Sequence, residues 1–258
     1  MLGAIAGDVI GSVYEHHHIK TEDFNLFHPS CIFTDDTVMT IAVADAILHQ
    51  QGYAEAMKRF GRLFPHAGYG GQFIRWIFED EVRPYNSWGN GAAMRVSPIG
   101  LAFKNVDTVL KEAARSAEVS HNHPEGIRGA QAVALAVHLA RQGKSKTFIR
   151  GEIAQRFGYD LDHCLDEIRP HYKFDISCQG SVPPALIAFF ESRDYEDAIR
   201  KAVSLGGDSD TLACITGGIA QAFYKDIPAE IVEFVLSRLP EEFIEILQEF
   251  EADFPGNS

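Results

Sequence analysis

The chain has 258 residues, of which 46% are hydrophobic and 23% charged, and its formal net charge is −13. This composition is typical of a globular protein with a sizeable core, and no apolar stretch approaches the roughly 20 residues that span a bilayer. The negative net charge disfavours an anionic membrane or a nucleic-acid duplex as partner. The alternative interpretation is that the excess of acidic residues only keeps the protein in solution.

The N-terminal segment and the cysteines indicate the compartment. MLGAIAGDVIG lacks a basic leader and carries Asp8, so we do not expect a signal peptide. No CxxC spacing occurs among the four cysteines, Cys31, Cys164, Cys178 and Cys214. They therefore suggest neither a zinc site nor a disulfide framework, and a cytoplasmic protein is expected.

The opening segment predicts a helix with one smooth face. Gly3, Gly7 and Gly11 recur every four residues and so share a face suited to close helix packing. Asp8, in the middle of this helix, is expected to be a structural carboxylate. Glu15 ends the apolar run where a loop begins, and it is a candidate for a catalytic role in a cleft.

A first acidic motif, Thr34-Asp35-Asp36-Thr37, stands at the start of the apolar segment 36–48. This segment predicts a central helix that is buried nearly all round, with the carboxylates at its N-terminus, where the helix dipole favours anions. Two adjacent carboxylates beside an apolar core repel each other unless a cation neutralises them. Helix capping is the alternative interpretation, but it accounts for only one such residue per helix.

Loops with ligand-binding character follow. Gly68-Tyr69-Gly70-Gly71 predicts a flexible rim, and Gly89-Asn90-Gly91 ahead of a helix exposes backbone N–H groups that can cradle a phosphate. Asn-Gly is also a common turn. For Arg95, a contact with phosphate and an internal salt bridge are equally expected. In the loop Ser120–Pro124, His121 is a candidate ligand contact or a structural histidine.

Helical periodicity dominates the remaining chain. Apolar residues recur at three- and four-residue intervals in segments 106–118, 126–142, 195–204, 229–238 and 240–249. Helix starts are expected at Pro124, Pro183-Pro184, Pro228 and Pro240, and helix ends at Gly143, Gly158 and Gly206-Gly207. We predict an all-α fold, a compact orthogonal bundle of about a dozen helices in one domain over residues 1–258.

A second acidic motif, Asp208-Ser209-Asp210-Thr211, leads into the apolar segment 211–224, a second buried helix. Oxygen ligands of this kind suit magnesium, manganese or calcium rather than zinc or copper. The two motifs are far apart in sequence, so the fold must bring them together to make one site. Four aspartates with Thr34 and Thr211 predict a dinuclear metal site in a metal-dependent enzyme.

Five segments taken in order, GDVIGSVYE, FTDDTVMT, WGNGAAMR, SHNHP and GGDSDT, resemble the ADP-ribosylglycohydrolase family, of the dinitrogenase-reductase-activating glycohydrolase or ADP-ribosyl-acceptor hydrolase type. The resemblance runs over about residues 1–225. It implies an ADP-ribosylglycohydrolase-like fold with two Mg²⁺ ions, or Mn²⁺, in a cleft that receives ADP-ribose.

The resemblance also implies roles for individual residues. The implied metal ligands are Thr34, Asp35, Asp36, Asp208, Asp210 and Thr211. The implied substrate contacts are Trp88, Gly89, Asn90, Gly91, Ala92 and Ala93 in a pyrophosphate- and ribose-binding loop, with His121, and with Ile176 on the adenosine side. Glu15, Asp35 and Asp36 are the catalytic candidates, and either Asp36 or Glu15 would accept a proton from water.

The implied function is magnesium-dependent hydrolysis of the glycosidic bond between ADP-ribose and an acceptor, with release of ADP-ribose. The expected partner is an ADP-ribosylated protein or a small ADP-ribose conjugate, and a monomer is expected. Alternatives are hydrolysis of O-acetyl-ADP-ribose or of ADP-ribosylated nucleic acid, a pyrophosphatase that releases AMP, and a non-catalytic ADP-ribose-binding protein. Intact acidic motifs argue against the last, because a binding protein has no need of six metal ligands.

Overall fold

The structure, a computed structural model, describes residues 1–81 and 83–255. Over these residues it is all-α and contains no strand, only one isolated bridge between Gly89 and Ser177. The helices are α1 (Leu2–His16), α2 (Asp35–Leu48), α3 (Tyr53–Leu63), α4 (Gly71–Phe78), α5 (Gly91–Met94), α6 (Ser97–Ala102), α7 (Val106–Glu118), α8 (Pro124–Arg141), α9 (Lys146–Phe157), α10 (Leu165–Ile168), α11 (Cys178–Glu191), α12 (Tyr195–Val203), α13 (Ser209–Tyr224), α14 (Ala229–Leu236) and α15 (Glu241–Asp253).

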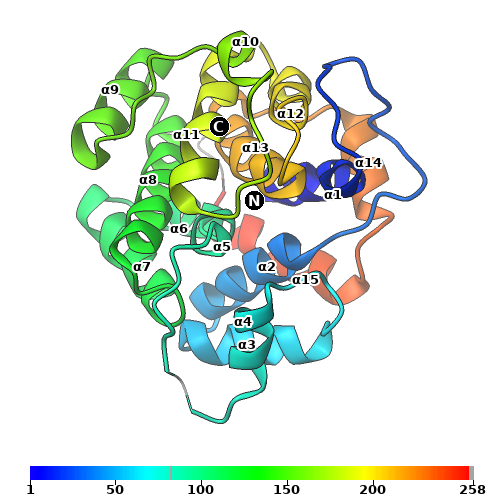
Figure 1. Cartoon of the computed structure of the whole chain (residues 1–258). Coiled ribbons are helices and arrows are strands. Elements are labelled where there is room, and N and C mark those ends of the chain that lie inside the picture. Colours follow the sequence, from blue (N-terminus) through cyan, green and yellow to red (C-terminus); the bar gives the residue numbers. More distant parts are fainter. Residues whose placement is uncertain (82, 256–258) are drawn as a thin grey trace.

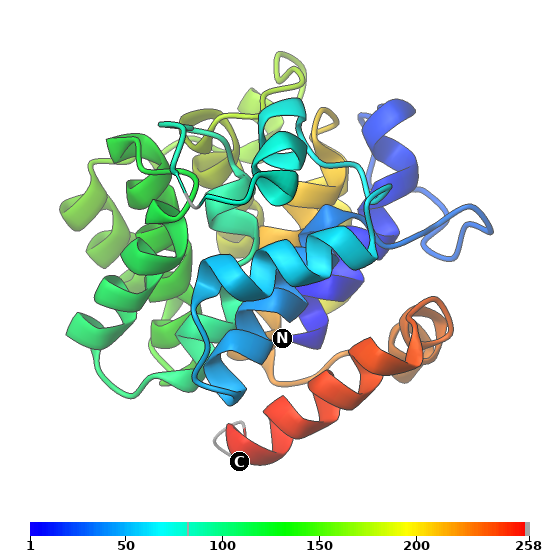
Figure 2. The ribbon, with the colours of Figure 1, turned by 90° about the horizontal axis from the view of Figure 1, so that it is seen from below.

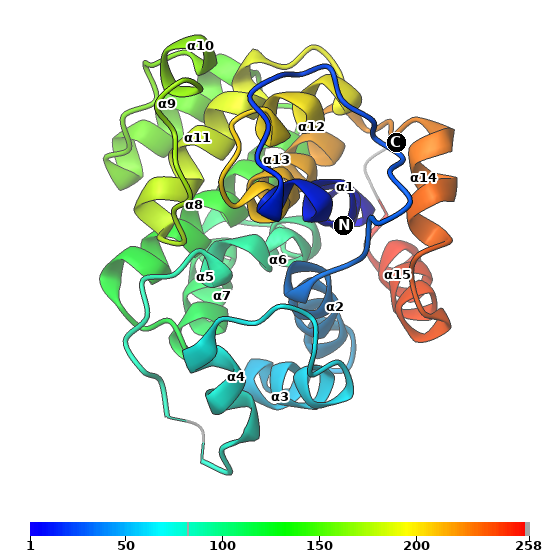
Figure 3. The same cartoon turned by 45° about the vertical axis from the view of Figure 1, so that its right-hand side comes forward.

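The two helices that follow the acidic motifs lie in the core, as predicted. α2 and α13 are buried along nearly their whole length. α13 packs against α1, α8, α11 and α12, and Figure 3 shows α1, α2 and α13 in the middle of the molecule, with α8 and α11 on one side and α14 and α15 on the other. α15 covers α2 from outside (Figure 2).

α1 and α13 lie side by side in very close contact (Figure 1). A Cβ atom added at Gly7 would lie 2.0 Å from the carbonyl oxygen of Ala213, and one at Gly11 would lie 2.5 Å from that of Ser209. The glycine face predicted from the sequence is therefore the α13-packing face. This contact places the C-terminal end of α1 beside the N-terminal end of α13, where the second acidic motif begins.

The prediction that helices begin at prolines is confirmed at three sites and wrong at the fourth. Pro124 is the first residue of α8, and Pro228 and Pro240 are the N-caps of α14 and α15. Pro183 and Pro184, however, lie inside α11. That helix begins earlier because the Ser177 hydroxyl caps it by accepting from the N–H of Gly180 at 3.0 Å, and of the two prolines only Pro184 is buried.

No helix in the described part of the chain is long and apolar enough to cross a membrane.

Candidate metal centre and active-site cleft

Both acidic motifs line one cavity of about 420 Å³. It lies where the N-terminal ends of α2 and α13 meet the C-terminal end of α1. Its walls are formed by Glu15, Thr34, Asp35, Asp36, Gly68, Gly70, Gly71, Gln72, Phe73, Tyr85, Ser87, Gly89, Asn90, Gly91, Met94, Arg95, His121, Phe174, Ile176, Asp208, Asp210 and Thr211. Asp36 and Thr211, 175 positions apart in the chain, thus share one cleft.

The carboxylates at the floor of the cleft form two groups that suit a metal ion. One ligand atom each from Asp8, Asp36 and Asp210 lie within 4.8 Å of one another, and the same holds for Glu15, Asp208 and Asp210. Burial, and then the neighbouring carboxylates, raise the pKa of Asp36 and of Asp210 well above the usual value. So many buried acidic groups in contact require either protons or cations to balance their charge.

Two orphaned oxygen atoms favour cations. Asp36 Oδ1 and Asp210 Oδ1 are buried and have no hydrogen-bond partner in the described structure. Buried polar atoms are almost always paired, and exceptions call for an unseen ligand or ion. Because carboxylate oxygens are preferred ligands of Mg²⁺ and Mn²⁺, the donor set fits a divalent cation.

The two motifs are also bonded to each other and to the rim. The Thr211 hydroxyl donates to Asp36 Oδ2 at 3.1 Å. Asn90 Nδ2 donates to Asp208 Oδ2 at 2.7 Å and to Ser181 Oγ at 2.9 Å. Asn90 therefore holds the glycine-rich loop against the second motif.

Helix capping explains part of the first motif and none of the second. Thr34 is the N-cap of α2, and its hydroxyl accepts from the N–H of Asp36 at 3.3 Å. Asp208 is the N-cap of α13 but makes no side-chain capping bond. Asp35 belongs to neither group of three carboxylates, but it lines the cleft. Its Oδ1 lies 3.5 Å from the position that a Cβ atom on Gly68 would take. Capping thus leaves the aspartates unexplained.

The loop before α5 meets the cleft only in part. Gly89, Asn90 and Gly91 line the cavity, but the N–H groups of Gly89 and Asn90 donate to Ser87 Oγ and to the Ile176 carbonyl, which leaves that of Gly91 for a phosphate. Ala92 and Ala93 are fully buried behind it, and Trp88 is largely exposed and packs its ring on His123. Trp88, Ala92 and Ala93 therefore do not form the cavity wall.

His121 and Ile176 both reach the cleft. His121 is buried, and burial and then the charge of Arg95 hold its pKa well below the usual value. Its Nε2 atom lies 3.1 Å from where a Cβ on Gly91 would be, so the ring presses on the glycine loop. At the rim, Ile176 is 60% exposed and Phe174 50% exposed, which gives the entrance an apolar edge.

Sequence reasoning missed several wall residues. Phe73, Tyr85 and Phe174 come from α4 and from loops, and no spacing or motif marks them. Arg95 was expected to contact a phosphate or to form an internal salt bridge; it lines the cavity and has no ion pair among the described residues. It is fully buried, and its Nη2 donates to neutral partners, the Ser116 carbonyl at 2.8 Å and Ser120 Oγ at 3.2 Å.

Comparison with known proteins identifies the family of the chain. The family model for the ADP-ribosylglycohydrolases matches residues 1–254, and the chain belongs to that family. The chain is 30% identical to ADP-ribosylhydrolase ARH3 of Mus musculus over 87% of this chain and 82% of that protein, and 28% identical to ARH3 of Homo sapiens over 87% and 84%.

A bacterial relative and a solved structure extend the comparison. ADP-ribosylarginine hydrolase Tri1 of Pseudomonas putida is 26% identical over 91% of this chain and 72% of that protein. A solved "ADP-ribosylglycohydrolase-related protein complex" superposes with a TM-score of 0.77 at 24% identity, covering 98% of this chain and 95% of the other. This last likeness shows that the fold is shared.

Proposed function

We propose that this protein is a magnesium-dependent hydrolase that cleaves the glycosidic bond between ADP-ribose and an acceptor and releases ADP-ribose. Family membership and the ADP-ribosylhydrolase relatives support the reaction class. The observation that carries the proposal is the meeting of carboxylates from α1, α2 and α13 at the floor of one cleft, with two of their oxygens buried and unpaired.

Six residues would hold two divalent cations: Thr34, Asp35, Asp36, Asp208, Asp210 and Thr211. Their donor atoms are all oxygens, which suits Mg²⁺ first and Mn²⁺ as a substitute. Bound there, the cations supply positive charge that orients the hydroxyl groups of the distal ribose and activates water. Glu15 and Asp8 complete the acidic surroundings, and Asp8 acts by holding Thr34 in place.

The rest of the cleft binds the diphosphate and the adenosine. The backbone N–H of Gly91, together with His121, faces the diphosphate, whereas the N–H groups of Gly89 and Asn90 are already bonded to Ser87 Oγ and to the Ile176 carbonyl. Ile176 and Phe174 offer an apolar surface to the adenosine at the entrance. Ala92 and Ala93 support the loop from behind, and the acceptor group extends outward past the rim.

Glu15 is the group that we assign to accept the proton of the attacking water. Asp36 is buried and bonded to Thr211, whereas the Glu15 side chain retains 26% exposure at the end of α1 and faces the cavity. As the water oxygen bonds to C1″, the bond from C1″ to the acceptor breaks, and the acceptor leaves with the electron pair and takes up a proton, so positive charge develops on the ribose in the transition state. The surrounding carboxylates stabilise that charge.

Product identity tests this function. The purified protein would be incubated with Mg²⁺ and a panel of ADP-ribosylated arginine, serine, acetyl and nucleic-acid substrates, and the products identified by mass. Free ADP-ribose from at least one glycosidic conjugate is the expected result, and Glu15→Gln should lower kcat by about 10²–10⁴ if Glu15 is the base. Release of AMP would contradict the proposal, as would the absence of any product.

A further inference from the structure

A row of three hydrogen-bonded side chains, Arg95, Ser120 and His121, lies at the cleft wall, and its first and last members line the cavity. Arg95 Nη2 donates to Ser120 Oγ at 3.2 Å, and Ser120 Oγ is 2.8 Å from His121 Nδ1. Arg95 and Ser120 are completely buried, and His121 is nearly so. The row ends at the cavity, where His121 Nε2 faces Gly89 and Gly91.

The direction of each hydrogen bond follows from the donor and acceptor inventory. A guanidinium can only donate, so Arg95 occupies a lone pair of Ser120 Oγ. The Ser120 hydroxyl has one proton left to place, and His121 Nδ1 is the other hydrogen-bond partner that this oxygen has in the described structure. The serine must therefore donate to Nδ1, because a buried unpaired hydroxyl proton is costly.

We propose that Arg95, acting through Ser120, holds His121 in the neutral tautomer that carries its proton on Nε2. Nδ1 accepts, so Nε2–H is a fixed donor that points at the glycine loop. Arg95 is then a positioning residue. It acts on His121 through Ser120, to which its Nη2 donates at 3.2 Å.

The other protonation states of His121 fit this site poorly. With the proton on Nδ1, the ring would donate to Ser120 Oγ and leave the serine proton without an acceptor. With protons on both nitrogens, a buried imidazolium would lie close to the buried guanidinium of Arg95. Repulsion of like charges away from water disfavours that state. The packing of the ring against Phe73 and Tyr85 leaves it little freedom to turn.

A fixed Nε2–H donor has a consequence for the reaction, which rests on the proposed function. It binds an anionic or carbonyl oxygen of the substrate beside Gly91 and neither gives nor takes a proton. Such a contact is made equally in the ground state and the transition state. Its loss therefore raises KM and leaves kcat nearly unchanged.

The tautomer can be measured in the free protein. Long-range ¹H–¹⁵N spectra of ¹⁵N-histidine-labelled protein distinguish the protonated ring nitrogen from the unprotonated one, and His121→Gln identifies the signals of His121. Ser120→Ala removes the serine link, and Arg95→Met removes the charge at similar volume. Ser116→Ala is the matched control, because its hydroxyl is also buried, in the last turn of α7 ahead of Ser120, but donates to the Ala113 carbonyl at 2.9 Å.

At neutral pH, wild type and Ser116→Ala should carry the His121 proton on Nε2, whereas Ser120→Ala and Arg95→Met should show the two tautomers in exchange. A proton on Nδ1 in the wild type, or a Ser120→Ala spectrum identical to the wild type, would overturn the proposal.

Calorimetric titration with ADP-ribose tests the consequence for binding. Ser120→Ala should bind about two- to tenfold more weakly than wild type, and Ser116→Ala should bind equally well. Unchanged affinity in Ser120→Ala would contradict the role of the donor in binding. A wild type that binds no ADP-ribose would contradict the proposed function instead, and the tautomer spectra of the free protein would still decide the proposal about Arg95.

Discussion

Asp8 lies outside both acidic motifs, yet it determines the geometry of the first. Its Oδ2 accepts from the N–H groups of Thr34 and Thr37 at 2.9 and 3.0 Å and also from the Thr37 hydroxyl, while Oδ1 accepts from the Thr34 hydroxyl at 2.7 Å. Both oxygens thus accept hydrogen bonds at the start of α2. The motif Thr34-Asp35-Asp36 owes its position to a carboxylate 26 residues earlier.

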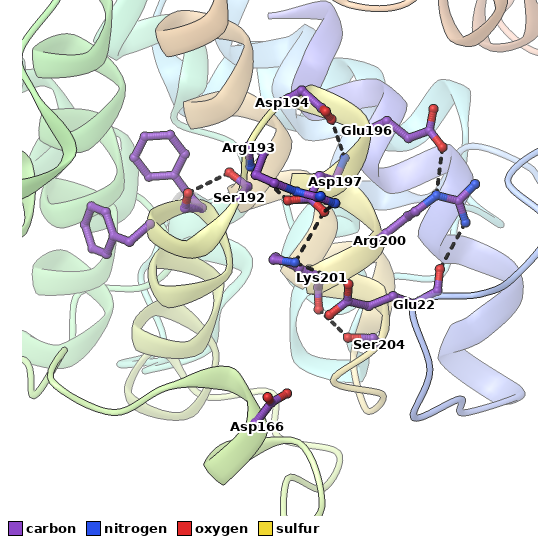
Figure 4. A network of polar contacts seen from close by, with 12 residues as sticks. Glu22, Asp166, Ser192, Arg193, Asp194, Glu196, Asp197, Arg200, Lys201 and Ser204 are labelled. Atoms are coloured by element: carbon purple, nitrogen blue, oxygen red, sulfur yellow. Dashed lines mark hydrogen bonds and ion pairs between the residues drawn. The ribbon is translucent and has the colours of Figure 1, made fainter.

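A second buried carboxylate, Asp197 on α12, stabilises the fold away from the cleft (Figure 4). It accepts from the N–H and from Nη2 of Arg193, both at 2.8 Å, and from Lys201 Nζ at 3.3 Å. Because two of these donors are charged, Asp197→Asn should lower the free energy of unfolding by about 1.5–3 kcal/mol at pH 7. Urea unfolding measures this loss.

The same residue predicts a pH dependence. Burial alone would raise the pKa of Asp197, but the hydrogen bonds from Arg193 and Lys201 outweigh it and hold the pKa below the usual 3.8. As the pH falls, the unfolded state therefore binds the proton before the folded state does. The stabilisation by Asp197 is complete above the usual pKa and is lost as the pH falls through the lowered pKa of the folded state.

The difference in the free energy of unfolding between wild type and Asp197→Asn should accordingly be constant above about pH 5 and shrink below about pH 4. A difference independent of pH would contradict the argument. Glu196→Gln is the control, since its carboxylate is 40% exposed and pairs with Arg200. An exposed pair of this kind contributes less than about 1 kcal/mol.

At the scale of helices, the contact between α1 and α13 positions the acidic groups. Gly11→Ala would place a Cβ 2.5 Å from the Ser209 carbonyl oxygen and 2.6 Å from Asp210 Cα. We expect the two helices to separate at a cost of about 1–3 kcal/mol in the free energy of unfolding. Since Asp210 moves with α13, affinity for Mg²⁺ should fall as well.

Gly151→Ala gives the matched control for that substitution. Gly151 lies in the exposed middle of α9, and a Cβ added there meets nothing within 4 Å. Alanine is the better helix former by about 1 kcal/mol, so this variant should be slightly more stable than wild type. A Gly11→Ala protein as stable as Gly151→Ala would show that the helices have room for a methyl group.

Helix positions were predictable wherever one face is apolar and the ends carry local signals. Segment 106–118 coincides with α7, whose N-cap Asn105 and amphipathic pattern are both local features. The start of α11 was misjudged at Pro183 and Pro184, because its cap, Ser177, stands well ahead of the prolines and was not recognised as a helix start. α15 runs to Asp253, beyond the predicted residue 249, because Phe250 is buried in the core.

For the molecule as a whole, the sequence predicted the chemistry of the cleft better than its shape. The aspartates of both motifs were recognisable because carboxylates close together beside apolar helices repel each other unless a cation neutralises them. Phe73 and Tyr85 were not, since an aromatic residue near a loop looks the same whether it packs in the core or lines a cavity. Arg95 and Ser120 meet only in the folded chain, so no local pattern could pair them.

The central claim is that both acidic motifs form one divalent-cation site on which hydrolysis of an ADP-ribose conjugate depends. The most direct measurement compares chelator-treated wild type, Asp36→Asn and Asp210→Asn before and after addition of Mg²⁺, by thermal midpoint and by release of ADP-ribose. In wild type, Mg²⁺ should raise the midpoint, because it binds the folded state, and should restore hydrolysis. Each variant, changed in only one motif, should lose both responses. Full hydrolysis by wild type in excess chelator, or both responses retained in either variant, would contradict the claim.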